Sequence, residues 1–219
     1  SSLGDLAQLH EGHGRLLAAL ALYERSLAIR HKRLAKTHPD LLSTLESLAR
    51  VESALGDCVQ ARDHYKKLLQ GLETSLGREH IGLVGCLEGL ARCEQAAGHY
   101  PAAEKLLRRA LRLRESVYGA GHPQTTWSTH HLAALRLAQG KSGEAISLYQ
   151  QSLSIRQGRL GSEHPDVAIS LCGLARAQTA QGDHDSALRA HERALVIRES
   201  TLDDGHPDIA LSLEGIAQV

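Results

Sequence analysis

The sequence lacks methionine, phenylalanine and asparagine altogether, and only 3% of its 219 residues are aromatic. A core without Phe or Met has to be built from Leu, Ala, Ile, Val and a few Tyr, which suits close packing of helices better than a thick multilayered core. An excess of charge is also missing, because 25 basic side chains balance 25 acidic ones. This balance argues against a nucleic-acid-binding protein, which normally carries a large basic excess.

Long apolar runs and a cysteine framework are missing as well. The longest uncharged apolar run, Leu16 to Tyr23, is far shorter than the roughly 20 residues that a membrane span needs, and no signal-like segment opens the chain. We therefore expect no membrane insertion. The four cysteines, at positions 58, 86, 93 and 172, are too few and too irregular for a disulfide framework. They are interpreted as reduced thiols, which indicates a cytoplasmic protein.

What the sequence has instead is an internal repeat of 42 residues. His-Pro pairs begin at positions 38, 122, 164 and 206, and His80 fills the empty place in this series, followed by Ile81. The same spacing relates glycines (14, 56, 98, 140, 182), alanines (19, 61, 103, 145, 187), leucines (27, 69, 111, 153, 195) and arginines (30, 114, 156, 198), with Leu72 as the exception in the arginine column. Repeats of this length are typical of solenoids and arrays. We divide the chain into one array of units 1–37 (partial), 38–79, 80–121, 122–163, 164–205 and 206–219 (partial), and expect it to be a piece of a longer protein.

Each unit predicts two helices. The first begins at the His-Pro corner, because proline is tolerated at the first helical position, and all five prolines of the chain fall at predicted helix starts. Apolar residues then recur every three or four positions, until a glycine such as Gly56 ends the helix as a left-handed cap. The second helix of unit 38–79 runs from about Val59 to Leu76. Neither helix buries its apolar stripe alone, so neighbouring units must stack.

Unit 164–205 shows the pattern most completely, with His164-Pro165-Asp166, Leu174-Ala175, Gly182, Ala187 and the run Ala194 to Glu199. This pattern resembles the tetratricopeptide repeat, specifically the 42-residue type of kinesin light chains and nephrocystin-3, and the resemblance covers essentially the whole chain. It implies an all-α, right-handed superhelical solenoid of antiparallel helix pairs, with about eleven helices. It also implies a non-catalytic interaction scaffold whose concave face, lined by the first helices, binds an extended peptide or a helix of a partner protein.

The resemblance further places the groove at four positions of each first helix. We take as candidate binding residues Glu46, Arg50, Glu88, Arg92, Trp127, His130 and Arg176; the same register adds Ser43, Ser53, Gly85, Gln95, Ala134, Leu137, Ile169, Cys172, Thr179, Leu211, Glu214 and Gln218. Glu46 and Arg50 are spaced i,i+4, as are Glu88 and Arg92. Either these residues pair with each other on the surface, worth a few tenths of a kcal/mol, or the arginines bind carboxylates of a ligand.

Trp127 is the only tryptophan. One interpretation is that it packs against the neighbouring first helix. The other is that it lies partly exposed and anchors an apolar side chain of a ligand, with Arg92 or Arg176 nearby, a composition typical of interface hot spots. Kinesin light chains place asparagine just before the Leu-Ala pair. This chain has none, so their cargo-binding mode cannot be carried over to it.

No pattern predicts a catalytic site, a cofactor or a metal. Gly140-Lys141-Ser142 resembles the end of a phosphate-binding loop, but Leu135 stands where that loop requires glycine. Five of the fourteen histidines belong to the corner column, one unit apart, too far for one ion. The alternative function is an intramolecular regulatory or self-associating repeat region of a larger protein, such as the sensor region of a multidomain NTPase, with self-association through exposed array ends. The family resemblance adds the cytoskeleton or cilium as locations.

Overall fold

The computed structural model describes residues 2–203 and 205–219, and within them the chain forms eleven α-helices and one 3-10 turn. The helices are α1 (Ser2–Gly12), α2 (Leu16–Arg33), α3 (Pro39–Ala54), α4 (Cys58–Leu76), α5 (Val84–Ala96), α6 (Tyr100–Tyr118), α7 (Thr125–Ala138), α8 (Ser142–Leu160), α9 (Pro165–Gln181), α10 (His184–Thr201) and α11 (Pro207–Ala217). The 3-10 turn, η1, spans Ile81–Leu83 and leads directly into α5. The second helix predicted over 59–76 is observed as α4, one residue longer at its start.

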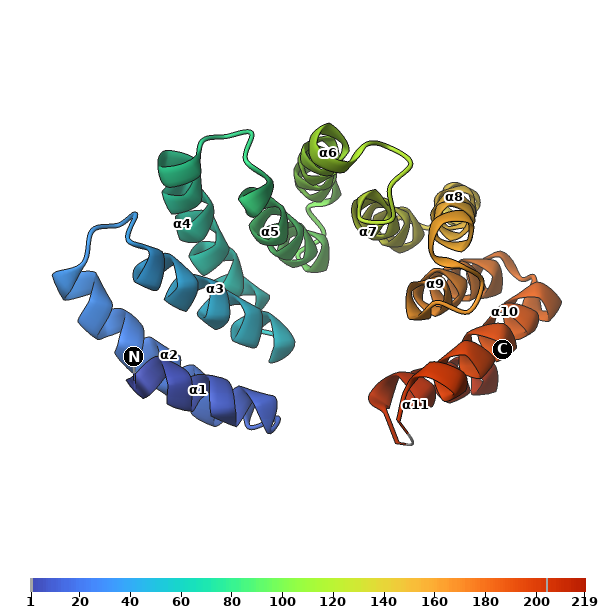
Figure 1. Ribbon diagram of the computed structural model, residues 1–219, viewed down its shortest axis with the longest axis horizontal. Coiled ribbons are helices and arrows are strands. Elements are labelled where there is room, and N and C mark those ends of the chain that lie inside the picture. The colour runs from blue at the N-terminus through green and yellow to red at the C-terminus, as the bar shows by residue number, and fades with distance from the viewer. Residues whose placement is uncertain (1, 204) are drawn as a thin grey trace. The chain divides into compact units, whose positions relative to one another are not determined.

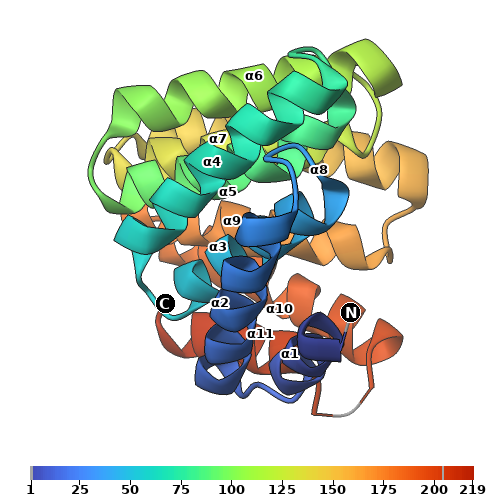
Figure 2. The same cartoon turned by 90° about the vertical axis from the view of Figure 1, so that its left-hand side faces the viewer.

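The chain divides into two compact units, residues 1–113 and 114–219, and the division falls inside α6. In the first unit, each helix from α1 to α5 packs against the next, and α3 also contacts α5. In the second unit, consecutive helices from α7 to α11 pack in the same way, while α9 also contacts α7 and α11. The pairs α3–α4 and α9–α10 are helical hairpins, and α1 lies beside α2 in both views (Figure 1, Figure 2). Within each unit, first helices therefore line one face, which we call the first-helix face.

Four of the five corner histidines cap the helical segment that follows them, and His122 makes the same contact in the turn before α7. His38 Nδ1 accepts a hydrogen bond from the backbone N–H of Asp40 at 3.2 Å, and the same bond forms at His80, His122, His164 and His206 at 3.0 to 3.2 Å. This contact satisfies one of the N–H groups that a helix start leaves unpaired. The sequence located these corners but did not show that the imidazole is the cap.

The predicted proline positions are correct except at one corner. The prolines at 39, 165 and 207 open α3, α9 and α11, and Pro101 is the second residue of α6. Pro123, however, lies in a turn and α7 begins only at Thr125. There the Thr126 hydroxyl donates to the Pro123 carbonyl at 2.6 Å, and the Thr125 hydroxyl donates to the Gly119 carbonyl at 2.8 Å. These side-chain bonds hold the turn and delay the helix.

The predicted left-handed glycine caps are confirmed. The φ angle is 85° at Gly56 and 87° at Gly182, and the corresponding glycines at 14, 98 and 140 have φ between 70° and 77°. An L-residue with a side chain rarely adopts this backbone conformation, whereas glycine does so at little cost. The column therefore fixes the tight link between the two helices of each pair.

The arginine column ties each helix pair to the start of the next. Arg156 and Arg198 each donate to a backbone carbonyl ten residues on and to a serine hydroxyl fourteen residues on, at 2.7 to 3.0 Å. Arg30 makes the same pair of bonds to Asp40 and Thr44. In the exceptional unit, Leu72 replaces the arginine and Cys86 replaces the hydroxyl, and both pack in one apolar cluster. A buried polar pair is thus exchanged as a pair, which avoids an unsatisfied group.

Glycines in the middle of first helices make room for rings of the preceding second helix. A Cβ atom at Gly89 would lie 2.4 Å from the ring of Tyr65, and one at Gly173 would lie 2.4 Å from the ring of Tyr149. Gly215 faces His191 in the same way. Because a glycine inside a helix costs about 1 kcal/mol relative to alanine, this close packing of rings explains its presence.

Candidate functional site

The first-helix face of the second unit contains a groove of about 650 Å³. We call it the α9–α11 groove, because most of its lining comes from these two helices: Leu137, Cys172, Arg176, Thr179, Ala180, His191, Arg198, Leu211, Glu214, Gly215 and Gln218. Seven of these residues stand at groove positions given by the repeat register, namely Leu137, Cys172, Arg176, Thr179, Leu211, Glu214 and Gln218. The register therefore gave seven of the eleven residues that share this hollow, and their binding role stays a prediction.

The groove combines an exposed cation with apolar and hydroxyl-bearing walls. Arg176 is exposed on α9, and Glu214 is exposed on α11. Burial raises the pKa of the Cys172 thiol, so this cysteine stays protonated and serves as a small apolar wall. Burial, and then the nearby charges of Arg198 and Arg176, lower the pKa of His191. The groove is suited to hold a carboxylate at Arg176, and it contains no activated nucleophile.

Trp127 lies on α7 and is half-buried. The guanidinium that accompanies it belongs to Arg156, whose Cζ atom is 4.6 Å from the centre of the Trp127 ring. Arg156 is fully buried and also donates from Nε to the Thr126 hydroxyl at 2.7 Å. The expectation that Arg92 or Arg176 supplies this charge is replaced by a cation–π contact with the arginine column.

His130 contributes a neutral ring to the same helix. Its ring meets Tyr149 edge-on with 5.0 Å between the ring centres. Burial is the main cause that lowers its pKa to about 3, and the charges of His131, Arg156 and Arg176 act in the same direction. His130 therefore carries no charge at neutral pH, and Arg176 is the charged member of the predicted set in this unit.

In the first unit, the predicted residues do not form the expected pairs. The Arg50 guanidinium pairs with both carboxylate oxygens of Glu11 on α1, with Nη2 3.0 Å from Oε2, and not with Glu46. Glu46 is exposed, whereas Glu88 is buried. The i,i+4 spacing did not reveal this, because the partner of Arg50 lies 39 residues away in the preceding helix pair.

Arg92 is exposed and forms a side-chain hydrogen bond with Tyr65. Burial raises the pKa of the Tyr65 phenol, and the charge and hydrogen bond of Arg92 oppose this rise. Lys141, the lysine of the incomplete phosphate-loop pattern, lies 3.5 Å from Glu144.

Nowhere in residues 2–203 and 205–219 do three His, Cys, Asp or Glu side chains gather as metal ligands would. Within the same ranges, every helix is too short or too polar to cross a membrane.

The model of the tetratricopeptide repeat family matches residues 1–74, 83–158, 138–200 and 166–219. Among solved structures, the chain is 30% identical to the nearly identical TPR-like repeats of a protein from Podosopora anserina described as a kinesin light chain candidate. That match covers 92% of this chain and 96% of the other, with a TM-score of 0.74. A search of curated protein sequences finds no significant match.

Two more distant structures share the fold. BtubC (BKLC) from P. vanneervenii is 23% identical, with 90% of this chain and 79% of that chain covered and a TM-score of 0.72. A Rap protein complexed with Competence and Sporulation Factor is 13% identical, with 90% and 53% covered and a TM-score of 0.74. The prediction of an all-α solenoid of antiparallel helix pairs is confirmed by these matches and by the observed helices.

Proposed function

The chain belongs to the tetratricopeptide repeat family, and we propose that it is a non-catalytic scaffold that binds an extended peptide or a helix of a partner protein on its first-helix face. The observation that carries this proposal is the α9–α11 groove, a hollow of about 650 Å³ lined by residues at the family's groove positions. Its volume lies within the range of pockets that hold small ligands or side chains of a bound peptide. The distant Rap structure, which holds its factor as a complex, supports binding as a use of this fold.

Arg176 favours an acidic side chain in the ligand, and the exposed Glu214 carboxylate favours an N–H donor elsewhere in the same segment. Arg176 offers a planar guanidinium that binds a carboxylate through two hydrogen bonds, and Thr179 and Gln218 can bond to a peptide backbone. Leu137 and Leu211 add apolar walls, and 55% of Leu211 is exposed before any ligand is bound. We therefore propose a ligand with an acidic side chain flanked by apolar ones, bound at Arg176.

The other predicted binding residues have different proposed roles, according to their exposure and their partners. Trp127, held by Arg156, is proposed as an apolar anchor in the second unit, and His130 as a neutral wall beside it. In the first unit, Arg92 and Glu46 are exposed, and Arg92 also forms a side-chain hydrogen bond with Tyr65. Arg50 is proposed to bind ligand only by leaving Glu11.

The test is to select binding peptides from a random library displayed on phage, and then to measure the affinity of the chain for synthetic copies of the selected peptides. We expect acidic, leucine-containing peptides whose affinity falls about thirtyfold in Arg176→Ala, a loss of roughly 2 kcal/mol. The matched control is Arg159→Ala, an exposed arginine of α8 outside the groove lining. Selected peptides without acidic residues, or equal affinity of the peptides for Arg176→Ala and Arg159→Ala, would show that the binding surface lies elsewhere.

A further inference from the structure

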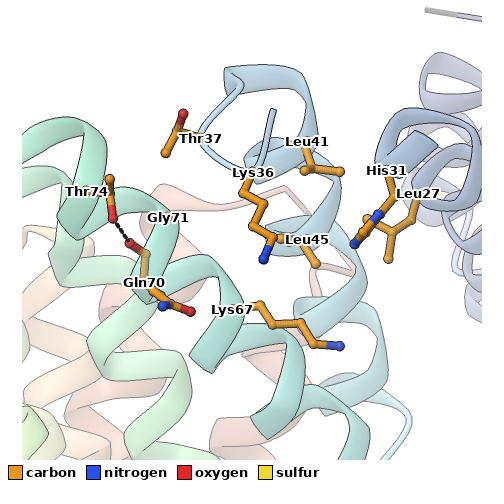
Figure 3. Close-up of a pocket in the computed structure, with 10 residues that line it drawn as sticks. All are labelled: Leu27, His31, Lys36, Thr37, Leu41, Leu45, Lys67, Gln70, Gly71 and Thr74. Carbon is orange, nitrogen blue, oxygen red and sulfur yellow. Dashed lines mark hydrogen bonds between the residues drawn. The ribbon is translucent and has the colours of Figure 1, made fainter. Parts of the chain in front are cut away.

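A second cavity, of about 340 Å³, opens between α2, α3 and α4, away from the residues assigned to the first-helix groove. It is lined by Leu27, His31, Lys36, Thr37, Leu41, Leu45, Lys67, Gln70, Gly71 and Thr74. The three leucines give it an apolar wall, and Figure 3 shows Lys36, Lys67 and His31 projecting into the opening from the loop before α3, from α4 and from α2. Its lining holds two lysines and no acidic residue.

We call the place where the second helices of two consecutive units meet a junction. The next junction, between α4 and α6, contains a carboxylate that the α2–α4 junction lacks. One repeat later, 42 residues on, the positions of His31, Lys36 and Lys67 are occupied by Glu73, Arg78 and Arg109. There the Glu73 carboxylate accepts from Arg109 at 2.5 Å and lies 3.7 Å from the Arg78 guanidinium. Arg109 also donates to the Arg78 carbonyl at 2.7 Å. At that junction two cations converge on one internal carboxylate.

At the α2–α4 junction the two cations remain but the carboxylate is replaced by an imidazole. Among the described residues, neither Lys36 nor Lys67 has an ion-pair or hydrogen-bond partner, and His31 has none either. At the junction of α8 and α10, position 157 is glutamine, and its amide oxygen, turned toward Arg193, accepts from that guanidinium at 3.0 Å. The first junction is thus the one where two lysines face an imidazole, which has no negative charge to pair with them.

The cavity is not a packing defect left by Gly71. Other repeats carry Leu113, Ile155 or Ile197 at this position, but a Cβ atom at Gly71 would lie 2.4 Å from Leu42 Cδ2. Leu42 is itself larger than its counterparts Val84, Thr126 and Ala168. Leu42 on α3 therefore already fills the space that a side chain at position 71 would occupy. The cavity is additional space beside Leu42.

We propose that this cavity binds a small aliphatic carboxylate, whose head group takes the place that the Glu73 carboxylate occupies at the next junction. Lys36 and Lys67 pair with the carboxylate, and the His31 imidazole donates a further hydrogen bond. The aliphatic body lies against Leu27, Leu41 and Leu45. A volume of about 340 Å³ is at the lower end of small-molecule pockets, which favours a free medium-chain acid over a folded partner.

The test uses isothermal titration of the whole chain with three eight-carbon probes, namely octanoate, 1-octanol and octylammonium. We expect octanoate to bind at least tenfold more tightly than octanol, and octylammonium not to bind. Lys67→Gln and Lys36→Gln should each weaken octanoate binding about tenfold. Lys105→Gln, an exposed lysine of α6 outside the cavity, is the matched control and should bind as the unmodified chain does.

The decisive variant is His31→Glu, which places the internal carboxylate of the next junction into the cavity. We expect it to abolish octanoate binding while raising the melting temperature, since it gives both lysines a partner, so loss of binding cannot be ascribed to unfolding. Equal affinity for octanoate and octanol, or undiminished binding to His31→Glu, would overturn the proposal. Binding only of an acidic peptide, with no response to octanoate, would overturn it as well and assign the lysines to a polypeptide partner.

Discussion

The buried arginine of the second unit offers the sharpest test of how the repeats are held together. Arg156 has no exposed surface and donates to the Thr126 hydroxyl, the Asp166 carbonyl and the Ser170 hydroxyl at 2.7, 2.8 and 3.0 Å. Its guanidinium also lies over the Trp127 ring. Burial lowers the pKa of Arg156 to about 10, so it remains charged at neutral pH and its lost hydration opposes these contacts.

Arg156→Leu removes the donor and leaves its acceptors behind. Thr126 keeps its own bond to Pro123, and the Asp166 carbonyl keeps its helical bond within α9, so the Ser170 hydroxyl is the group left short of a partner. Each buried group left unsatisfied costs about 1–3 kcal/mol, and the lost cation–π contact costs on the order of 1–2 kcal/mol. Relief of the buried charge offsets part of this sum. We expect a net loss of about 3 kcal/mol in the free energy of unfolding.

The double variant Arg156→Leu/Ser170→Cys copies the pair that the chain itself uses at Leu72 and Cys86. It removes the unsatisfied hydroxyl together with its donor, so we expect it to be about 1 kcal/mol more stable than Arg156→Leu alone, with coupling of about 1–2 kcal/mol between the two sites. The four members of the cycle are compared by urea unfolding, followed by circular dichroism and by the fluorescence of Trp127.

The control for helix composition is Arg159→Leu, an exposed position of α8 where we expect a change within about 0.5 kcal/mol. Additive effects of the two substitutions, within about 0.5 kcal/mol, would refute the idea that arginine and hydroxyl act as one unit. The same would follow if Leu72→Arg were tolerated as well alone as together with Cys86→Ser.

Two further predictions concern the rings in the second unit. The pKa of His130 is about 3 in the folded chain, so below about pH 6.5 only the unfolded chain protonates this imidazole. The free energy of unfolding is therefore highest above pH 6.5 and falls by roughly 1.4 kcal/mol per pH unit as the pH drops toward 3. Urea titrations at pH 7 and pH 5 should show this loss, and His130→Leu should abolish that part of it; an identical loss in both proteins would contradict the burial argument. Gly173→Ala places a Cβ atom 2.4 Å from the Tyr149 ring and should cost about 1–3 kcal/mol. Gly158→Ala meets no atom within 4 Å and should gain up to about 1 kcal/mol. Thermal unfolding compares the two glycine variants, and similar melting temperatures would show that Tyr149 yields to the added methyl group.

The repeat columns predicted the helices well, because local chemistry determines helix ends. A glycine with positive φ and a His-Pro corner each act on the residues next to them, and both features appeared where the 42-residue spacing placed them. Pro123 is the exception, since two threonine hydroxyls nearby compete for the backbone and move the helix start to Thr125. That competition depends on side chains outside the column.

The predicted groove positions overlap the α9–α11 groove, but the contacts of several predicted residues were not foreseen. The register gave seven of the eleven residues that line the α9–α11 groove, because residues spaced by three and four share one helix face, but it did not give Ala180, His191, Arg198 or Gly215. The partners of Arg50 and Trp127 were missed, since Glu11 and Arg156 lie on other helices, 39 and 29 residues away respectively along the chain. Such contacts follow from how neighbouring helix pairs stack, which the spacing within one helix does not specify.

Departures from a repeat become informative when both sides of each junction are compared. Where Leu72 replaces an arginine, Cys86 replaces the hydroxyl that the arginine would bind, and where Gly71 lacks a side chain, Leu42 supplies one. Both departures are compensated in the neighbouring element, as expected where contacts in an array are limited to adjacent units. His31 is different, because it replaces an acid while Lys36 and Lys67 keep the cations that this acid would bind. A compensated departure preserves packing, whereas an uncompensated one leaves charge available to a ligand, which is why the α2–α4 cavity and not the Leu72 junction is the second candidate site.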